Sequence, residues 1–251
     1  PYDPESLETR YVKYLSKDGT EIPMYITCMK NTKLNGKNPT ILYGYGGYGH
    51  TVEPGFDQST TLWLLHGGIL ATPNIRGGGA EGAEWALSGR KLKKQNAIDD
   101  FTSAAEYLIK EGYTNSEKLA VTGSSHGGLI VGAAITQRPE LFKTAIIEAG
   151  ALDMLRFEFF TVGSVNTNIN EFGTITDSLD FINLRSYSPL HNVKEDVNYP
   201  NVLLITGDHD DRVPPFHSYK FLARLQDKGS PKSLYQLYLI PGAGHGGALT
   251  R

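Results

Sequence analysis

Short apolar runs of strand length alternate with helical stretches along most of the chain. Runs of four to seven aliphatic and aromatic residues bounded by turn residues predict buried strands, and they cover residues 39–43, 68–72, 118–122, 144–148, 201–207 and 234–240. Residues 99–111 instead place apolar side chains on one helical face. This alternation predicts a doubly wound, mostly parallel α/β sheet with helices on both faces.

The start of the chain has a different pattern. Residues 11–15 and 21–27 are two strand-like segments, and the turn sequence Lys17-Asp18-Gly19-Thr20 lies between them. This arrangement predicts an antiparallel hairpin at the edge of the sheet. The chain has 251 residues, of which 39% are hydrophobic, so it can build the core of one such domain.

Composition excludes several classes of function. The net charge of −3 provides no basic surface for nucleic acid, and no apolar run is long enough to span a membrane. Cys28 is the only cysteine, so we expect no disulfide within the chain and no cysteine-based metal site, and we read it as a small buried apolar side chain. The glycines at 77–79 lack the spacing of a nucleotide-binding loop, and we expect no cofactor. Localisation stays open between cytoplasm and periplasm, with the cytoplasm favoured.

The segment Gly123-Ser124-Ser125-His126-Gly127 carries the strongest chemical signal. It follows a predicted strand and precedes an apolar helical run, 128–135. A G-x-S-x-G turn between a strand and a helix lifts the central serine hydroxyl clear of the sheet. Ser125 is therefore a candidate nucleophile, and the alternative is a glycine-rich turn that only joins the two elements.

An acid and a base are also found at predicted strand ends. Asp208, Asp210 and Asp211 follow the strand 201–207, and His245 lies in a glycine-rich loop after 234–240. Open α/β sheets assemble their sites at these ends of the strands. The chain order serine, acid, histidine is that of α/β-hydrolases. Each aspartate has an alternative role as a turn or helix cap.

The negative charge that develops during acyl transfer needs hydrogen-bond donors. The backbone N–H of His126 is one candidate, because it follows the nucleophile. The glycine-rich segment 43–49, at the end of another predicted strand, is the candidate source of the second donor. The remaining histidines are interpreted as structural: His50, His66, His191, His209 and His217.

Several blocks of sequence together resemble one known family. They read Y-G-Y-G-G-Y at 43–48, N-I-R-G-G-G at 74–79, K-Q-N at 94–96, Y-S-P-L-H-N-V at 187–193 and D-H-D-D-R-V at 208–213. In this order they resemble the catalytic domain of the prolyl oligopeptidase family, from about Leu15 to His245. The resemblance implies an α/β-hydrolase fold and a serine peptidase that cleaves short peptides after proline through an acyl-enzyme.

The resemblance also implies roles for individual residues. Ser125, Asp210 and His245 match the family's catalytic triad, and Tyr45 matches the tyrosine whose hydroxyl binds the oxyanion together with the His126 N–H. Arg212 matches the arginine that grips the substrate backbone. The apolar pocket for proline draws on Tyr48, Val213 and Phe172, and Phe172 replaces a family tyrosine.

The sequence departs from the family pattern in two places. Gly123-Ser124-Ser125-His126-Gly127-Gly128 replaces the usual G-G-S-N-G-G. Counting from Asp153 places Asn166 where the family has a tryptophan that stacks on the substrate proline, within an apparently irregular stretch, 161–179. We therefore expect a weakened preference for proline. An esterase, a dipeptidyl or acylaminoacyl peptidase, and a catalytically silent binding domain remain alternatives.

The resemblance finally implies a particular domain organisation. In the family a seven-bladed β-propeller precedes the hydrolase region and a last helix follows the catalytic histidine. We therefore expect residues 1–251 to be a catalytic domain that lacks both, and we expect a propeller domain and a peptide substrate as its partners.

Overall fold

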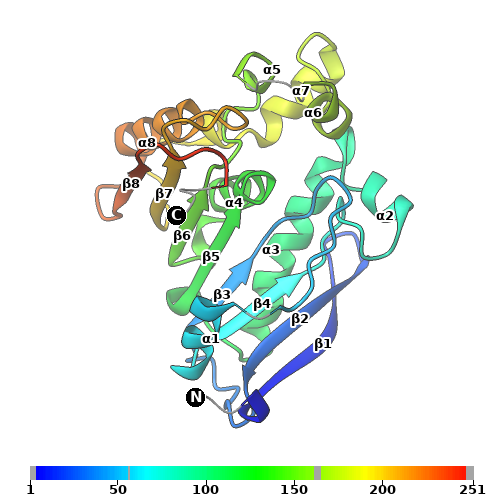
Figure 1. The fold of residues 1–251 in the computed structure, drawn as a ribbon, viewed down its shortest axis with the longest axis vertical. Helices are drawn as coiled ribbons and strands as arrows, with labels where there is room; N and C mark the ends of the chain where they lie inside the picture. The colour runs from blue at the N-terminus through cyan, green and yellow to red at the C-terminus, as the bar shows by residue number, and fades with distance from the viewer. Residues whose placement is uncertain (1–3, 56, 161–164, 247–251) are drawn as a thin grey trace.

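Eight strands form one sheet within the residues that the computed structural model describes, which are 4–55, 57–160 and 165–246 (Figure 1). The strands are β1 (Leu7–Leu15), β2 (Glu21–Met29), β3 (Thr40–Tyr43), β4 (Ile69–Pro73), β5 (Leu119–Ser124), β6 (Thr144–Glu148), β7 (Asn201–Gly207) and β8 (Tyr235–Ile240). The helices are α1 (Gln58–Leu65), α2 (Ala83–Leu87), α3 (Lys94–Lys110), α4 (His126–Gln137), α5 (Phe157–Phe160), α6 (Val165–Phe172), α7 (Ser178–Tyr187) and α8 (Phe216–Lys228).

The strand order is β1-β2-β4-β3-β5-β6-β7-β8. β1 and β2 pair antiparallel, β2 pairs antiparallel with β4, and every later pairing is parallel. This confirms the predicted edge hairpin and the mostly parallel sheet. Cys28 is fully buried in β2, as predicted. The chain direction reverses across the sheet between β3 and β5, and the carboxyl ends of two such neighbouring strands form a crevice in which open α/β sheets bind ligands.

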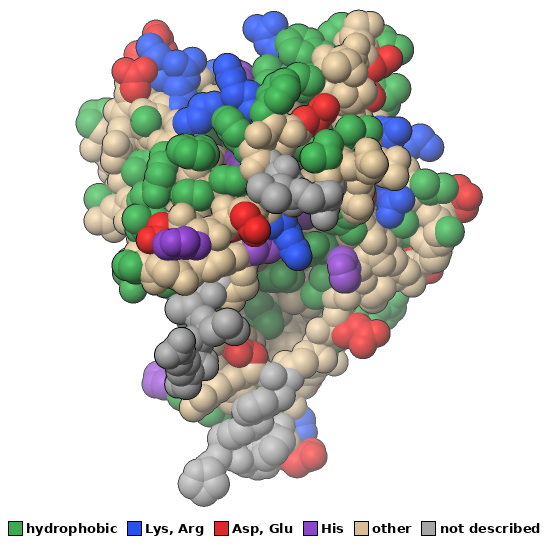
Figure 2. All heavy atoms as spheres, turned by 45° about the horizontal axis from the view of Figure 1, so that its top comes forward, with side chains coloured by type: hydrophobic (Ala, Val, Ile, Leu, Met, Phe, Trp, Pro, Cys, Tyr) green, Lys and Arg blue, Asp and Glu red, His purple; other side chains and the backbone are tan. Residues whose placement is uncertain are grey.

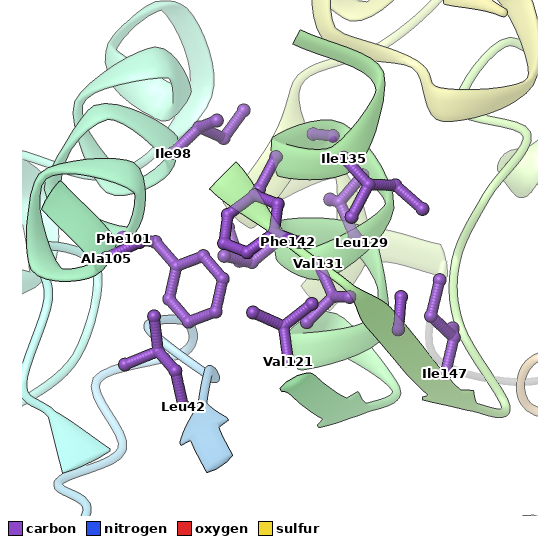
Figure 3. Close-up of a cluster of buried hydrophobic side chains, with 14 of the residues drawn as sticks. Leu42, Ile98, Phe101, Ala105, Val121, Leu129, Val131, Ile135, Phe142 and Ile147 are labelled. Carbon is purple, nitrogen blue, oxygen red and sulfur yellow. The ribbon is translucent and has the colours of Figure 1, made fainter. Parts of the chain in front are cut away.

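The core lies between the sheet and the helices α3 and α4. Figure 3 shows Leu42 of β3 beside Phe101 of α3. In the same view Val121 of β5 and Ile147 of β6 lie beside α4, which carries Leu129. All five side chains are completely buried. The helix α4 has buried side chains all around its axis, which is typical of a helix at the centre of a domain. This packing fixes the helix that begins immediately after Ser125.

Residues 161–164 of the stretch expected to be irregular, 161–179, lie outside the described residues. For the remainder, 165–179, the expectation is wrong, because two helices occupy most of it. α6 occupies 165–172, and α7 begins at Ser178. Gly173, with φ +91°, follows α6. Asp177 caps α7, because its side chain accepts hydrogen bonds from the backbone N–H groups of Leu179 and Asp180. Gly173 thus ends one helix and Asp177 starts the next, so the segment between them is a short connection and not one long loop.

Candidate active site

Ser125 lies on a sharp turn between β5 and α4. Its backbone adopts φ +56° and ψ −115°, which is unusual for a residue with a side chain. Close approach of the backbone makes this turn depend on glycine. A Cβ on Gly127 would lie 2.1 Å from the carbonyl oxygen of Gly44, and one on Gly123 would lie 2.5 Å from that of Gly127. The predicted G-x-S-x-G turn between a strand and a helix is therefore present.

His245 joins Ser125 to Asp210. The His245 Nε2 atom lies 3.0 Å from Ser125 Oγ, and its Nδ1 atom lies 2.8 Å from Asp210 Oδ2. The other carboxylate oxygen of Asp210 accepts hydrogen bonds from the backbone N–H groups of Arg212 at 3.0 Å and Val213 at 2.9 Å. Burial opposes ionisation of Asp210, but these hydrogen bonds outweigh burial, so its pKa is lowered.

This geometry assigns the protons. An ionised carboxylate only accepts hydrogen bonds, so His245 Nδ1 carries a proton that it donates to Asp210. His245 Nε2 is then free to accept the proton of the Ser125 hydroxyl. The arrangement can generate a nucleophilic alkoxide and hold the imidazolium that forms.

The other two aspartates of this loop do not reach His245. Asp208 Oδ1 pairs with His209 Nδ1 at 2.6 Å and accepts the backbone N–H of Gly242 at 2.7 Å. The side chain of Asp208 thus binds its own loop, and Asp211 is exposed. The sequence left three aspartates as candidates, and the structure brings Asp210 to His245.

Tyr45 follows the end of β3, and His126 follows Ser125 after the end of β5. Both line a cavity together with Ser125. His126 is the first residue of α4, where backbone N–H groups have no partner within the helix. Burial, followed by the charges of Tyr43 and Glu171, raises the pKa of the Tyr45 hydroxyl, which therefore keeps its proton at neutral pH. Both groups can donate hydrogen bonds.

The cavity beside Ser125 has a volume of about 380 Å³. Its described lining consists of Tyr45, Tyr48, His50, Ser125, His126, Ala151, Phe157, Thr167, Asn168, Phe172, Arg212, Val213 and His217. None of these residues carries a carboxylate. Figure 2 views the molecule with the end that carries α5, α6 and α7 brought forward, and hydrophobic, basic and histidine side chains lie close together on this face.

Aromatic side chains build one wall of the cavity. Phe172 is almost completely buried at the end of α6. Its ring stands at 86° to that of Tyr48, with 6.0 Å between the ring centroids, and at 70° to that of Phe157 at 5.4 Å. Val213 is also buried. The structure thus brings the predicted pocket residues Tyr48, Phe172 and Val213 together.

Arg212 has a different position from these apolar residues. It lines the cavity but is exposed to solvent. Within the described part of the chain, its guanidinium forms no ion pair with a carboxylate within 4.0 Å. A guanidinium in this situation is available to bind the carbonyl or carboxylate oxygen of a ligand.

The placement of Asn166 in the cavity wall is not supported by the structure. Asn166 is exposed near the start of α6 and does not line the cavity, whereas Thr167 and Asn168 do. The Tyr48 hydroxyl lies 2.8 Å from Asn168 Oδ1. Residues one or two positions apart on a helix point in different directions, so Asn166 and Asn168 have different surroundings.

A cluster of buried charged side chains contacts the cavity residue His126, and no pattern in the sequence indicated it. Lys94 Nζ lies 2.6 Å from Glu171 Oε1 and 3.0 Å from His126 Nε2, and all three side chains are buried. Arg90 Nε lies 2.9 Å from Glu171 Oε2. Lys94 belongs to one of the blocks that carry the family resemblance, but a buried lysine cannot be distinguished from an exposed one by sequence pattern.

His217 is buried at the start of α8 and forms part of the same cavity. Its Nδ1 atom accepts hydrogen bonds from the backbone N–H groups of Leu152 at 3.2 Å and Asp153 at 3.0 Å. Burial lowers the pKa of His217 to about 4, so the ring is neutral at pH 7. Its interpretation as a structural histidine agrees with these contacts, although the sequence did not indicate that it lines the cavity.

The described residues offer no metal centre. They contain no group of three or more histidine, cysteine, aspartate or glutamate side chains placed to bind a metal ion. No helix within 4–55, 57–160 and 165–246 is both long and apolar enough to cross a bilayer.

Comparison with known proteins gives consistent results. Residues 54–251 match the model of the prolyl oligopeptidase family. The chain is 48% identical over 246 residues to the prolyl endopeptidase of Elizabethkingia meningoseptica, which covers 98% of this chain and 35% of that protein.

Solved structures agree with the sequence comparison. A chain from a structural study of two prolyl endopeptidases superimposes with a TM-score of 0.95 at 47% identity, covering 98% of this chain and 36% of that one. A post-proline cleaving enzyme from Rickettsia typhi gives a TM-score of 0.92 at 36% identity, covering 98% and 35%. The chain thus spans about a third of the length of these relatives. It has the predicted α/β-hydrolase fold and belongs to the prolyl oligopeptidase family.

Proposed function

We propose that this chain is the catalytic part of a serine peptidase that hydrolyses short peptides on the carboxyl side of proline. The observation that carries the proposal is the line of contacts from Ser125 Oγ through His245 to Asp210, with distances of 3.0 and 2.8 Å, at the edge of an aromatic cavity. The names of its relatives, prolyl endopeptidase and post-proline cleaving enzyme, support the choice of substrate.

In the proposed acylation step, His245 Nε2 takes the proton of Ser125 as Oγ attacks the substrate carbonyl carbon. The proton passes from His245 to the leaving amine as the carbon–nitrogen bond breaks, which leaves an acyl-enzyme on Ser125. A water molecule then attacks the acyl carbon while His245 accepts its proton. The ester bond to Ser125 breaks, His245 returns the proton to Ser125 Oγ, and the carboxylic acid product leaves. Asp210 stabilises the imidazolium of His245 in both steps.

The carbonyl oxygen becomes negatively charged in each step. We assign its stabilisation to the His126 backbone N–H and the Tyr45 hydroxyl, which line the cavity beside Ser125. Both donors are held by the protein before the charge develops, so they need little reorganisation during the reaction. The raised pKa of Tyr45 keeps its hydroxyl in the donating form.

The aromatic wall favours proline in the cavity. Tyr48, Phe172 and Val213 offer flat or aliphatic contacts, and a proline ring brings no N–H that would require a partner. Arg212 is the proposed contact to the substrate backbone. Thr167 and Asn168 add a polar edge, on which the strength of the proline preference over alanine depends.

We also propose that this domain works together with a β-propeller domain, as the family resemblance implies. The length of the relatives supports this part of the proposal, because the chain spans 35% of the first of them. Mass spectrometry of the natural polypeptide, followed by limited proteolysis, tests it by asking whether a second folded domain is present.

The test of function is a competition among matched peptides with proline, alanine or arginine before the cleaved bond, measured as kcat/KM in the full-length protein. The proposal expects proline to be preferred and arginine to be rejected. Labelling of Ser125 by a fluorophosphonate checks the nucleophile separately. Preference for simple esters, or for dipeptide release, would instead support the alternative hydrolases, and absence of labelling and turnover would indicate a silent binding domain.

A further inference from the structure

The imidazole of His126 is buried in the wall of the cavity and does not project into solvent. Its Nδ1 atom lies 2.7 Å from the carbonyl oxygen of Tyr45, and its Nε2 atom lies 3.0 Å from Lys94 Nζ. One face of the ring stacks on Phe172, with 5.6 Å between ring centroids and an angle of 8°. A Cβ on Gly47 would lie 2.6 Å from the ring, so the backbone there packs tightly against it. The ring is held from several sides.

The partners of this ring determine which nitrogen carries the proton. The Tyr45 carbonyl oxygen can only accept a hydrogen bond, and the Lys94 ammonium can only donate one. Nδ1–H of His126 therefore donates to Tyr45, and Nε2 accepts from Lys94. Burial and the charge of Lys94 hold the pKa of His126 well below its usual range, which agrees with a neutral ring.

The hydrogen bond to Tyr45 crosses 81 residues of sequence. It links α4, which begins with the N–H assigned to the oxyanion, to the loop after β3, which carries the hydroxyl assigned to the oxyanion. We propose that the His126 imidazole is a positioning residue that fixes the separation of these two donors. The inference rests on the proposed function, because it concerns the donors that hydrolysis uses.

Lys94 and Glu171 extend this support to a second point of the same loop. Glu171 Oε1 accepts a hydrogen bond from Lys94 at 2.6 Å, and its Oε2 accepts the backbone N–H of Tyr48 at 3.2 Å. Arg90 forms a second ion pair with Glu171, with its Nε atom 2.9 Å from Oε2. The loop is thus held at Tyr45 directly by His126, and at Tyr48 by Glu171, which Lys94 links to His126. A site held in this way keeps its donors in place when substrate binds.

Three substitutions of His126 test its hydrogen bonds to Tyr45 and to Lys94 separately. In His126→Asn the side-chain amide nitrogen takes the place of Nδ1 and can still donate to Tyr45. In His126→Gln the amide oxygen can replace Nε2 as acceptor for Lys94, but the donor to Tyr45 is lost. His126→Phe keeps a ring between Gly47 and Phe172 and makes neither hydrogen bond.

We expect His126→Asn to keep kcat for a proline substrate within roughly 10-fold of the unmodified protein. His126→Gln and His126→Phe should lower kcat by about 10²-fold with KM changed by less than about 3-fold, because a donor displaced by about 1 Å stabilises the transition state poorly. A loss confined to kcat indicates that the oxyanion donors are misplaced, whereas a general loss of structure would also change KM. Kinetics are compared in the full-length protein for variants with unaltered circular dichroism.

Thr114→Val is the matched control. Thr114 is also buried and donates to the Asn38 carbonyl oxygen at 2.8 Å, near the opposite ends of β3 and β5. It should lower Tm and leave kcat unchanged. Nitrogen-15 NMR of the labelled histidine supplies a readout without turnover, and it should show a neutral His126 with the proton on Nδ1.

The possible failures are distinguishable. Full kcat in His126→Gln and His126→Phe, with normal hydrolysis by the unmodified protein, overturns the positioning role and leaves the proposed function intact. A proton on Nε2 of His126 overturns it as well. If the unmodified protein neither reacts with a fluorophosphonate nor hydrolyses peptides, the proposed function fails and the inference fails with it.

Discussion

The Nε2 atom of His245 lies 3.0 Å from Ser125 Oγ, although 120 residues separate them in the sequence. Ser125 follows β5 and His245 follows β8, so the contact spans the sheet from a central strand to an edge. Asp210 follows β7, the strand next to the edge strand β8, and completes the line of contacts. The parallel arrangement makes this possible, because the carboxyl ends of these strands all lie at one end of the sheet.

Substitutions of Ser125, His245 and Asp210 should lower the rate of catalysis while the protein remains folded. Ser125→Ala and His245→Ala are each expected to lower kcat on the order of 10⁶-fold by removing the nucleophile or its base, and Asp210→Asn should be less severe. The measurement is burst and steady-state kinetics with a proline substrate, on protein shown to be free of other proteases.

Asp208→Asn is the matched control for Asp210→Asn. Asp208 belongs to the same loop but pairs with His209 and the backbone of Gly242, so its loss should change kcat by less than about 3-fold. Equal losses for the two aspartate variants would contradict the role given to Asp210.

Tyr45→Phe tests the side-chain donor to the oxyanion. Removing its hydroxyl should lower kcat by roughly 10² to 10³-fold and change KM little, since the hydrogen bond matters mainly in the transition state. Tyr43→Phe removes a hydroxyl two residues earlier, outside the lining of the cavity, and should have little effect. A similar loss in both variants would argue against a specific role for Tyr45.

Phe172→Ala should weaken the preference for proline. Loss of the aromatic wall removes apolar contacts and ring packing worth about 0.5 to 1.5 kcal/mol beyond buried area. The measurement is the ratio of kcat/KM for proline and alanine peptides. Asn166→Ala on the same helix is the control, because Asn166 is exposed outside the cavity, and a larger effect there than at Phe172 would contradict the assigned wall. Arginine should be rejected by both variants, since the described lining has no carboxylate to pair with it.

The buried His217 should make stability depend on pH. Burial lowers its pKa from 6.5 to about 4, so the unfolded chain binds a proton between these values that the folded protein does not. The free energy of unfolding should therefore fall as pH falls from 6.5 toward 4, by about 2 kcal/mol from this residue at pH 4.5. Urea unfolding at pH 7 and 4.5 measures the change.

His217→Asn is the corresponding control for pH dependence. Its amide oxygen can still accept the backbone N–H groups that His217 binds, but it does not titrate. The variant should lose less stability between pH 7 and pH 4.5 than the unmodified protein. An unchanged pH dependence would show that groups other than His217 determine it.

Local patterns in the sequence determined most of the sheet and the chemical candidates. Strand runs are recognisable because alternate or continuous apolar residues must be buried, and the turn around Ser125 is recognisable because its flanking glycines permit close backbone contact. These requirements are properties of a few neighbouring residues. For the same reason the sequence placed His245 and a group of aspartates at strand ends, but it did not distinguish Asp210 from Asp208 without the family resemblance.

Tertiary structure alone decided which side chains share an environment. Asn166 and Asn168 are similar residues on one helical turn, yet the direction of α6 brings Asn168 to the cavity and leaves Asn166 in solvent. Lys94, His126 and Glu171 belong to α3, α4 and α6, and their burial and mutual contacts arise because these three separate helices pack together. Burial and contact depend on how distant segments pack together, and a linear pattern of residue types does not contain that information.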